Sequence, residues 1–310
     1  CSRRNGLAMR ASRALWAGMR VDKVKGLMSH LYLAIYDDGR RLLLDSGCRG
    51  DFSVVQSHLL ECTREGPGAG SGGLLSACVV THAHPDHSGA AEPWVQAQVP
   101  VVAPRGVNLW YKGLRGGLQR RIDIGLARLV IHLTATGSQP SFLSAVRAAL
   151  WEVCSPSGDL ALPGDIPYDL EVVEEGPVHP LFPDWVALQT PGHTSHMLAL
   201  YHAEAQVLYA ADCLIYIGGQ FRLPLVVDFP SVQAETLRRL ASLPLKQLLL
   251  AHGGAFSADR HNLNSELLRL AEEAERIESD GPPGDLRWRI MRPFTYVVTE
   301  EILRSRRVLR

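Results

Sequence analysis

Four side chains that commonly bind metal ions lie within six positions of this chain. The run THAHPDH contains His82, His84, Asp86 and His87. In an extended loop, His82 and His84 point to the same side because they are two residues apart. Pro85 turns the chain, so that the two residues after it face a different point. One short loop can therefore supply ligands to two metal ions.

Three further candidate ligands lie in separate segments far along the chain. TPGHTSH contains His193, YAADC contains Asp212 and LLAHGG contains His252. Imidazole and carboxylate groups suit zinc, and a closed shell around two ions needs more ligands than one loop offers. The sequence therefore predicts a site at which the loop and three distant segments meet.

Apolar runs that predict strands precede these residues. LLSACVV predicts a buried strand ending at the histidine loop, and KQLLLAHGG predicts one ending at His252. SHLYLAIYDD and RLLLDSG predict a hairpin, with Asp45 at the end of its second strand. Helices are predicted for FSVVQSHLLECT, for PSFLSAVRAALWEV and for SVQAETLRRLASL, with Ser231 capping the last. Strands that alternate with helices indicate an α/β protein.

In this order, the segments resemble the motifs of the metallo-β-lactamase superfamily over roughly residues 25–255. The resemblance implies a four-layer αββα sandwich, with two mixed sheets face to face, helices outside and metals at one edge. It implies that one zinc ion is bound by His82, His84 and His193, and a second by Asp86, His87 and His252, with Asp212 bridging them. It also implies that Asp45 holds the histidine loop by hydrogen bonds from outside the ligand set.

The resemblance further implies a dinuclear zinc hydrolase, with iron or manganese as alternative metals. A hydroxide bridging two zinc ions would cleave a small ester, lactone or thioester, while Asp86 orients it and relays its proton. Tyr216 is a candidate to donate a hydrogen bond to the oxyanion, as a tyrosine does in related lactonases, and the alternative of a core or rim tyrosine is favoured over this role. His196 is expected to support the ligands or lie at the surface rather than touch substrate.

Two other activities stay open on the same metal core. A phosphodiesterase or nuclease would show strongly salt-dependent RNA binding. An iron-dependent redox enzyme is less favoured, because the complete HxHxDH run favours zinc. The run GHTSHM departs from the GHTxGH typical of glyoxalase II, which weakens a glutathione-thioester assignment.

The composition favours a small-molecule substrate. The 32 basic and 32 acidic residues cancel, so no global field attracts nucleic acid or an anionic membrane. No apolar stretch reaches the roughly twenty residues that span a bilayer. Six scattered cysteines favour a reducing, cytoplasmic setting. We expect no nucleic-acid or membrane partner.

The chain is expected to have three parts. Residues 1–20 are Arg-rich and contain no acid, which predicts a disordered or processed tail and leaves organelle targeting open. Residues 21–260 are predicted to form the metallo-β-lactamase-fold domain. Residues 261–310 are predicted to form a C-terminal helical extension packed on the core, because an apolar stripe recurs at helical spacing. The stripe consists of Leu263, Leu267, Leu270, Ala274 and Ile277.

An insertion at about residues 105–184 is predicted to form a helical cap or lid. It contains Trp110, Tyr111, Phe142 and Trp151. These aromatic side chains could line an apolar substrate pocket. They could equally well anchor the lid or form a homodimer contact.

Overall fold

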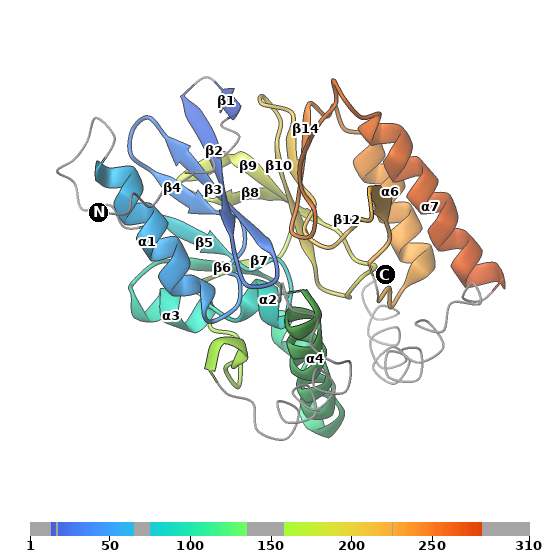
Figure 1. The fold of residues 1–310 in the computed structure, drawn as a ribbon, viewed down its shortest axis with the longest axis horizontal. Helices are drawn as coiled ribbons and strands as arrows, with labels where there is room; N and C mark the ends of the chain where they lie inside the picture. The colour runs from blue at the N-terminus through green and yellow to red at the C-terminus, as the bar shows by residue number, and fades with distance from the viewer. Residues whose placement is uncertain (1–13, 17, 65–74, 135–157, 225, 281–310) are drawn as a thin grey trace, which may run out of the picture.

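Two β-sheets lie face to face, with helices on both outer faces (Figure 1). The computed structural model describes residues 14–16, 18–64, 75–134, 158–224 and 226–280. In Figure 1, α1 and α3 cover one sheet, and α6 and α7 cover the other. The chain therefore has the predicted α/β architecture, a four-layer αββα sandwich.

The first sheet contains seven strands in chain order. They are β1 (Ala14–Trp16), β2 (Met19–Lys25), β3 (His30–Tyr36), β4 (Arg41–Leu43), β5 (Ala77–Val79), β6 (Val101–Pro104) and β7 (Leu170–Val172). The second sheet has the order β15-β14-β11-β10-β9-β8. Its strands are β8 (Gly176–His179), β9 (Phe182–Gln189), β10 (Leu198–His202), β11 (Val207–Tyr209), β14 (Gln247–Leu250) and β15 (Gly254–Ser257).

The helices follow the predicted periodicity in most places. They are α1 (Asp51–Arg64), α2 (Pro85–Ser88), α3 (Ala91–Gln96), α4 (Gly113–Thr134), α6 (Pro230–Ala241) and α7 (Leu263–Asp280). Short 3-10 turns span Val107–Leu109 and Gly158–Leu160, and β12 (Ile215–Ile217) pairs with β13 (Gln220–Arg222) in a separate hairpin. The helix α6 begins at Pro230, so the prediction that Ser231 caps it was wrong.

Strand β3 shows why both faces of a sheet must be covered. Leu31, Leu33 and Ile35 pack under α1 and α3. Tyr32 and Ala34 point to the opposite side, into the core between the sheets. Alternate residues of a strand face opposite sides, so a strand with apolar residues on both sides is buried between two layers.

The parallel strands end at one edge of the sandwich. β4, β5 and β6 run parallel in the first sheet, and β11 runs parallel to β14 in the second. The loops that leave these strands carry Asp45, His82, Asp212 and His252. Carboxyl ends of parallel strands meet at the same edge, which is where α/β proteins bind ligands.

Two predicted boundaries differ from the structure. The predicted tail of residues 1–20 includes residues that belong to the first sheet. β1 pairs with β2 from Ala14 onward, and Met19 is buried. Residues 1–13 lie outside the described residues. The predicted insertion at residues 105–184 includes β7, β8 and the start of β9, so the segment outside the sheets ends before Leu170. These strands are short or partly exposed, and their apolar pattern is correspondingly weak.

The cap and the C-terminal extension are partly described. α4 confirms a helix in the insertion, and it packs with Ile124 and Ala127 against Leu160. The predicted helix PSFLSAVRAALWEV, with Phe142 and Trp151, lies outside the described residues. The stripe on α7 is buried as predicted, next to α6.

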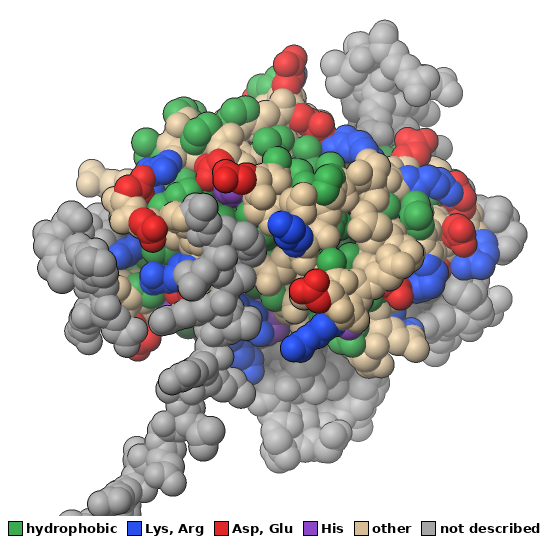
Figure 2. Space-filling view, turned by 90° about the horizontal axis from the view of Figure 1, so that it is seen from above, with side chains coloured by type: hydrophobic (Ala, Val, Ile, Leu, Met, Phe, Trp, Pro, Cys, Tyr) green, Lys and Arg blue, Asp and Glu red, His purple; other side chains and the backbone are tan. Residues whose placement is uncertain are grey.

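None of the described helices has the length and apolar character that crossing a membrane requires. On the coloured part of the face in Figure 2, acidic and basic side chains are interspersed. This surface agrees with the balanced composition.

Candidate metal centre

The histidine loop changes conformation at Pro85. His84 is extended, with φ −62° and ψ 151°, and α2 begins at the next residue. Proline favours this position because its fixed φ suits the first turn of a helix. Asp86 and His87 therefore extend from a helical turn, whereas His82 and His84 come from the extended segment before it.

Three histidines and one aspartate form the first group of ligand atoms. His82 Nε2 and His193 Nε2 each lie 3.0 Å from His84 Nδ1. His193 Nε2 lies 3.5 Å from Oδ2 of Asp212. One atom from each of these residues lies within 4.8 Å of the others.

The second group contains Asp86, His87 and His252. Oδ2 of Asp86 lies 3.4 Å from His87 Nε2 and 3.1 Å from His252 Nε2. Oδ1 of Asp212 lies 3.4 Å from the same atom of His87 and 3.5 Å from that of His252. Asp212 thus turns one oxygen to each group.

The nearby backbone and side chains fix the orientation of two ligand rings. Nδ1 of His193 lies 2.6 Å from the carbonyl oxygen of Val226, and Nδ1 of His87 lies 2.5 Å from Oδ2 of Asp45. A metal ion can bind Nε2 of each ring in the tautomer whose single proton lies on Nδ1 and donates in these pairs. Partners of this kind fix the tautomer and ring orientation of metal-binding histidines.

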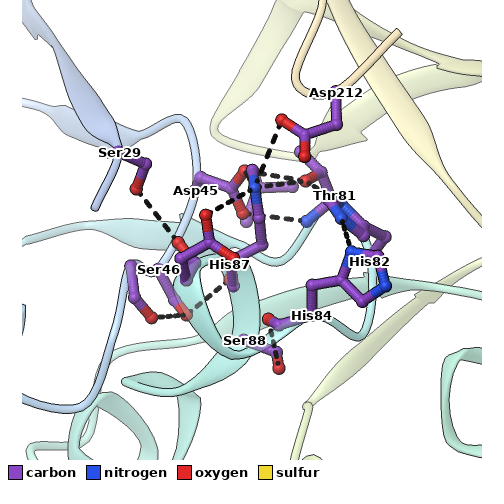
Figure 3. A network of polar contacts seen from close by, with 12 residues as sticks. Ser29, Asp45, Ser46, Thr81, His82, His84, His87, Ser88 and Asp212 are labelled. Carbon is purple, nitrogen blue, oxygen red and sulfur yellow. Dashed lines mark hydrogen bonds and ion pairs between the residues drawn. The ribbon is translucent and has the colours of Figure 1, made fainter. Parts of the chain in front are cut away.

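Asp45 also organises the residues around it (Figure 3). It accepts hydrogen bonds from the backbone N–H of Thr81 at 3.1 Å, from the Thr81 hydroxyl at 2.7 Å and from the Tyr209 hydroxyl at 2.9 Å. Its φ of 142° lies in a region that non-glycine residues rarely adopt. The fold therefore places this carboxylate at the expense of local backbone strain.

The ligand groups differ in charge. Burial, followed by the charge of His87, lowers the pKa of His82 well below its usual value. Burial also lowers the pKa of His84 and of His193 to about 4. Neutral imidazole is the form that binds a metal, so these three rings are ready as ligands at neutral pH.

The carboxylates stay charged although they are buried. Burial alone would raise the pKa of Asp212, but the positive charges of His252 and His87 hold it well below its usual range. Burial would likewise lower the pKa of His87, but the charges of Asp86, Asp45 and Asp212 raise it well above its usual value.

Two buried atoms show that a cation fits between the groups. Among the described residues, His87 Nε2 and Asp212 Oδ1 have ion-pair neighbours at 3.4–3.5 Å but make no hydrogen bond of normal geometry. Buried polar atoms are normally satisfied, and unsatisfied ones indicate an ion or water. Nitrogen and oxygen donors 3.0–3.5 Å apart suit dications such as zinc. The residues present therefore fit two metal ions.

The other two predicted residues lie beside the centre. The backbone N–H of Tyr216 donates to the carbonyl oxygen of His252 at 2.8 Å, while its ring packs with Phe221 and Phe256. The ring of His196 is half-buried, and a Cβ added to Gly106 would come within 2.8 Å of it. His196 thus contacts the start of the cap, and catalysis by Tyr216 stays a prediction.

Several residues of this region escaped the sequence analysis. The Tyr209 hydroxyl binds Asp45, and Ser29 donates to the carbonyl oxygen of Asp86 at 3.1 Å. From the cap, Oδ2 of Asp123 lies 3.9 Å from His84 Nε2 and accepts a hydrogen bond from the Tyr111 hydroxyl at 2.9 Å. The lone acid in the run LQRRIDIG was the one available signal for Asp123.

Trp110 packs beside the first ligand group. Its side chain is 4% exposed, and its ring centroid lies 6.0 Å from that of His84 in an edge-to-face arrangement. This burial favours the anchoring role over a broad substrate surface.

The structure resembles solved members of one superfamily. A metallo-beta-lactamase from Erythrobacter litoralis aligns with a TM-score of 0.53 and 15% identity, over 86% of this chain and 97% of that one. An archaeal metallo-beta-lactamase superfamily protein from Sulfolobus tokodaii aligns with a TM-score of 0.51 and 17% identity, over 88% and 98%. At such identities the likeness concerns the fold.

The sequence comparisons agree with this likeness. Probable metallo-hydrolase YflN of Bacillus subtilis (strain 168) is 24% identical over 222 residues, which are 67% of this chain and 75% of that protein. The hydroxyacylglutathione hydrolase of Chelativorans sp. (strain BNC1) is 29% identical over 103 residues, 31% of this chain and 39% of that enzyme. The family described as Metallo-beta-lactamase superfamily matches residues 25–252, well over half of the chain. This chain belongs to the metallo-beta-lactamase superfamily and has the side-chain clusters of a metallo-hydrolase.

Proposed function

We propose that this protein is a dinuclear zinc hydrolase that cleaves a small ester, lactone or thioester. The position of Asp212 carries the proposal, because its two oxygens face two separate sets of histidines. The first zinc ion would be held by His82, His84 and His193, and the second by Asp86, His87 and His252, with Asp212 shared. Iron or manganese would suit the same nitrogen and oxygen donors.

When bound, two zinc ions would supply a bridging hydroxide near neutral pH and positive charge against the oxyanion that develops. Besides binding the second zinc ion, Asp86 would take part in the reaction itself. Its carboxylate oxygen is close to both His87 and His252, at the edge of the second group. From there it would orient the nucleophile and accept its proton, passing that proton to the leaving group.

The cap supports a small substrate. α4 brings Asp123 toward His84, and Tyr111 holds the Asp123 carboxylate in place. The ring of Trp110 packs edge-to-face against the ring of His84. A cap that brings one polar group beside the metal ligands suits a small molecule better than a polymer.

The names of the relatives agree with hydrolysis. One is named a probable metallo-hydrolase and another a hydroxyacylglutathione hydrolase, and hydroxyacylglutathione is a thioester. Because the second relative matches less than a third of this chain, a thioester is one of three carbonyl classes to test. The mixed surface charge is also less suited to a polymeric anion than to a small molecule.

Metal analysis combined with one substitution tests the proposal. We expect two zinc ions in the dinuclear centre of each chain and hydrolysis of at least one lactone, ester or thioester in a panel. Asp212→Ala should lose the shared ligand, so metal content and turnover should both fall to near background. Asp259→Ala, which removes an exposed aspartate beyond the far end of β15, is the matched control.

Two outcomes would contradict the proposal. Full turnover with both metals retained in Asp212→Ala would remove the bridging role. Turnover of phosphodiesters alone would leave the metal centre in place but overturn the proposed substrate class.

A further inference from the structure

A second cluster of metal-binding side chains lies away from the centre described above. It consists of Asp22 on β2 and of His58 and Cys62 on α1. One atom from each residue lies within 4.8 Å of the other two. The dinuclear centre uses none of these residues.

The helix and the strand each place these groups for a geometric reason. His58 and Cys62 are four residues apart, so they lie on the same side of α1. Asp22 points to the same face of the sheet as Val24, which packs with Val55 and the other apolar residues under α1. The carboxylate is therefore turned from the strand toward the helix.

Asp22 occupies a position where an apolar residue would be expected. Its side chain is 4% exposed, which is costly for a carboxylate unless charges or hydrogen bonds compensate. Arg20 Nε lies 3.5 Å from Oδ1 of Asp22. The other oxygen, Oδ2, is the one that faces His58 and Cys62.

The three separations match those between the ligands of a zinc ion. Asp22 Oδ2 lies 3.4 Å from His58 Nε2 and 3.7 Å from Cys62 Sγ, and the last two atoms are 3.6 Å apart. Tetrahedral zinc has bonds of about 2.3 Å to sulfur and about 2.0–2.1 Å to nitrogen or oxygen. Simple trigonometry then puts the ligand atoms about 3.3–3.6 Å from one another.

The two contacts of Cys62 also suit hydrogen bonds to sulfur, but the separation of His58 and Asp22 is long for a direct hydrogen bond. A charged imidazole paired with a carboxylate is expected at about 2.7–2.9 Å, well below the observed 3.4 Å.

We propose that Asp22, His58 and Cys62 bind one zinc ion that joins helix α1 to strand β2. The mixed sulfur, nitrogen and oxygen donors are those that zinc uses in proteins. The His58 side chain is 26% exposed, so an ion can reach the site and a water molecule can fill the fourth position. The site is independent of the proposed hydrolase activity.

Cobalt substitution distinguishes this site from the dinuclear centre, which has no sulfur among its seven ligands. Protein loaded with Co²⁺ should show a near-ultraviolet sulfur-to-cobalt charge-transfer band. Cys62→Ser should abolish the band, and His58→Gln should reduce zinc content by about one ion per chain. Cys78→Ala, which removes a buried thiol outside this cluster, should keep both signals.

A measurement on the unaltered protein covers the case in which a variant does not fold. Zinc should protect Cys62 from alkylation by iodoacetamide, and a chelator should remove the protection. The proposal is overturned if the cobalt band is missing, if it survives Cys62→Ser, or if alkylation of Cys62 does not depend on zinc. None of these readouts uses hydrolysis, so failure here leaves the proposed function unaffected.

Discussion

Asp45 and His87 lie 42 positions apart in sequence, yet Oδ2 of Asp45 is 2.5 Å from Nδ1 of His87, and both side chains are fully buried. The pair joins the end of β4 to the first turn of α2. It directs His87 Nε2 toward Asp86 and Asp212. A carboxylate outside both candidate ligand groups therefore orients the ring of His87.

Asp45→Asn should weaken metal binding about 10–100-fold, because the amide nitrogen cannot accept from His87 or Thr81. Chelator competition with zinc measures the effect. Asp38→Asn, at an exposed turn, is the control and should bind as the unaltered protein does. Equal affinity in the two variants would show that Asp45 does not orient the ligand.

The metal-free protein should lose stability as the pH falls from about 6.5 to about 4. The pKa of His193 is lowered to about 4 by burial, whereas an unfolded histidine titrates near 6.5. In this window the unfolded state binds more protons, so acid favours unfolding, by up to about 3 kcal/mol for this residue.

His193→Asn should reduce that loss, because the amide keeps a donor for Val226 but does not titrate. Urea unfolding of chelator-treated protein at pH 7 and pH 4.5 measures how much unfolding free energy each of the two proteins loses between these pH values. Parallel losses in the variant and the unaltered protein would assign the acid sensitivity to other groups.

Trp110→Ala should reduce the free energy of unfolding by about 3–5 kcal/mol, since it leaves a cavity in a buried aromatic cluster. Because the indole also contacts the edge of His84, we expect kcat to fall more than KM changes. Trp110→Phe should recover most of the stability. A large change in KM with unaltered stability would instead place Trp110 at the substrate.

Leu267→Ala should cost about 2–5 kcal/mol of unfolding free energy, because Leu267 is fully buried between α7 and α6. Leu268, the next residue on the same helix, is 46% exposed. Leu268→Ala should change the free energy by about 0.5 kcal/mol or less. Similar effects of the two substitutions in chemical unfolding would show that α7 does not contribute to the core.

The residue patterns predicted an α/β protein and the meeting of seven side chains, and the resemblance to the superfamily added the four layers. Each of the seven follows an apolar run, and the types and order of the residues restrict the chemistry. Pro85 even indicated how one loop serves two groups, because a proline acts on the backbone beside it. Local patterns of this kind are visible in sequence, since neighbours along the chain determine them.

Tertiary structure decided what depends on distant partners. The bonds from Asp45 to Thr81, His87 and Tyr209 span 36 to 164 positions, and Asp22 meets the α1 side chains across 36 to 40. Short strands such as β7 and β1 form because a neighbouring strand supplies hydrogen bonds, not because their own residues demand it. The sequence determined which groups could bind metal, and the packing of two sheets decided which atoms face one another.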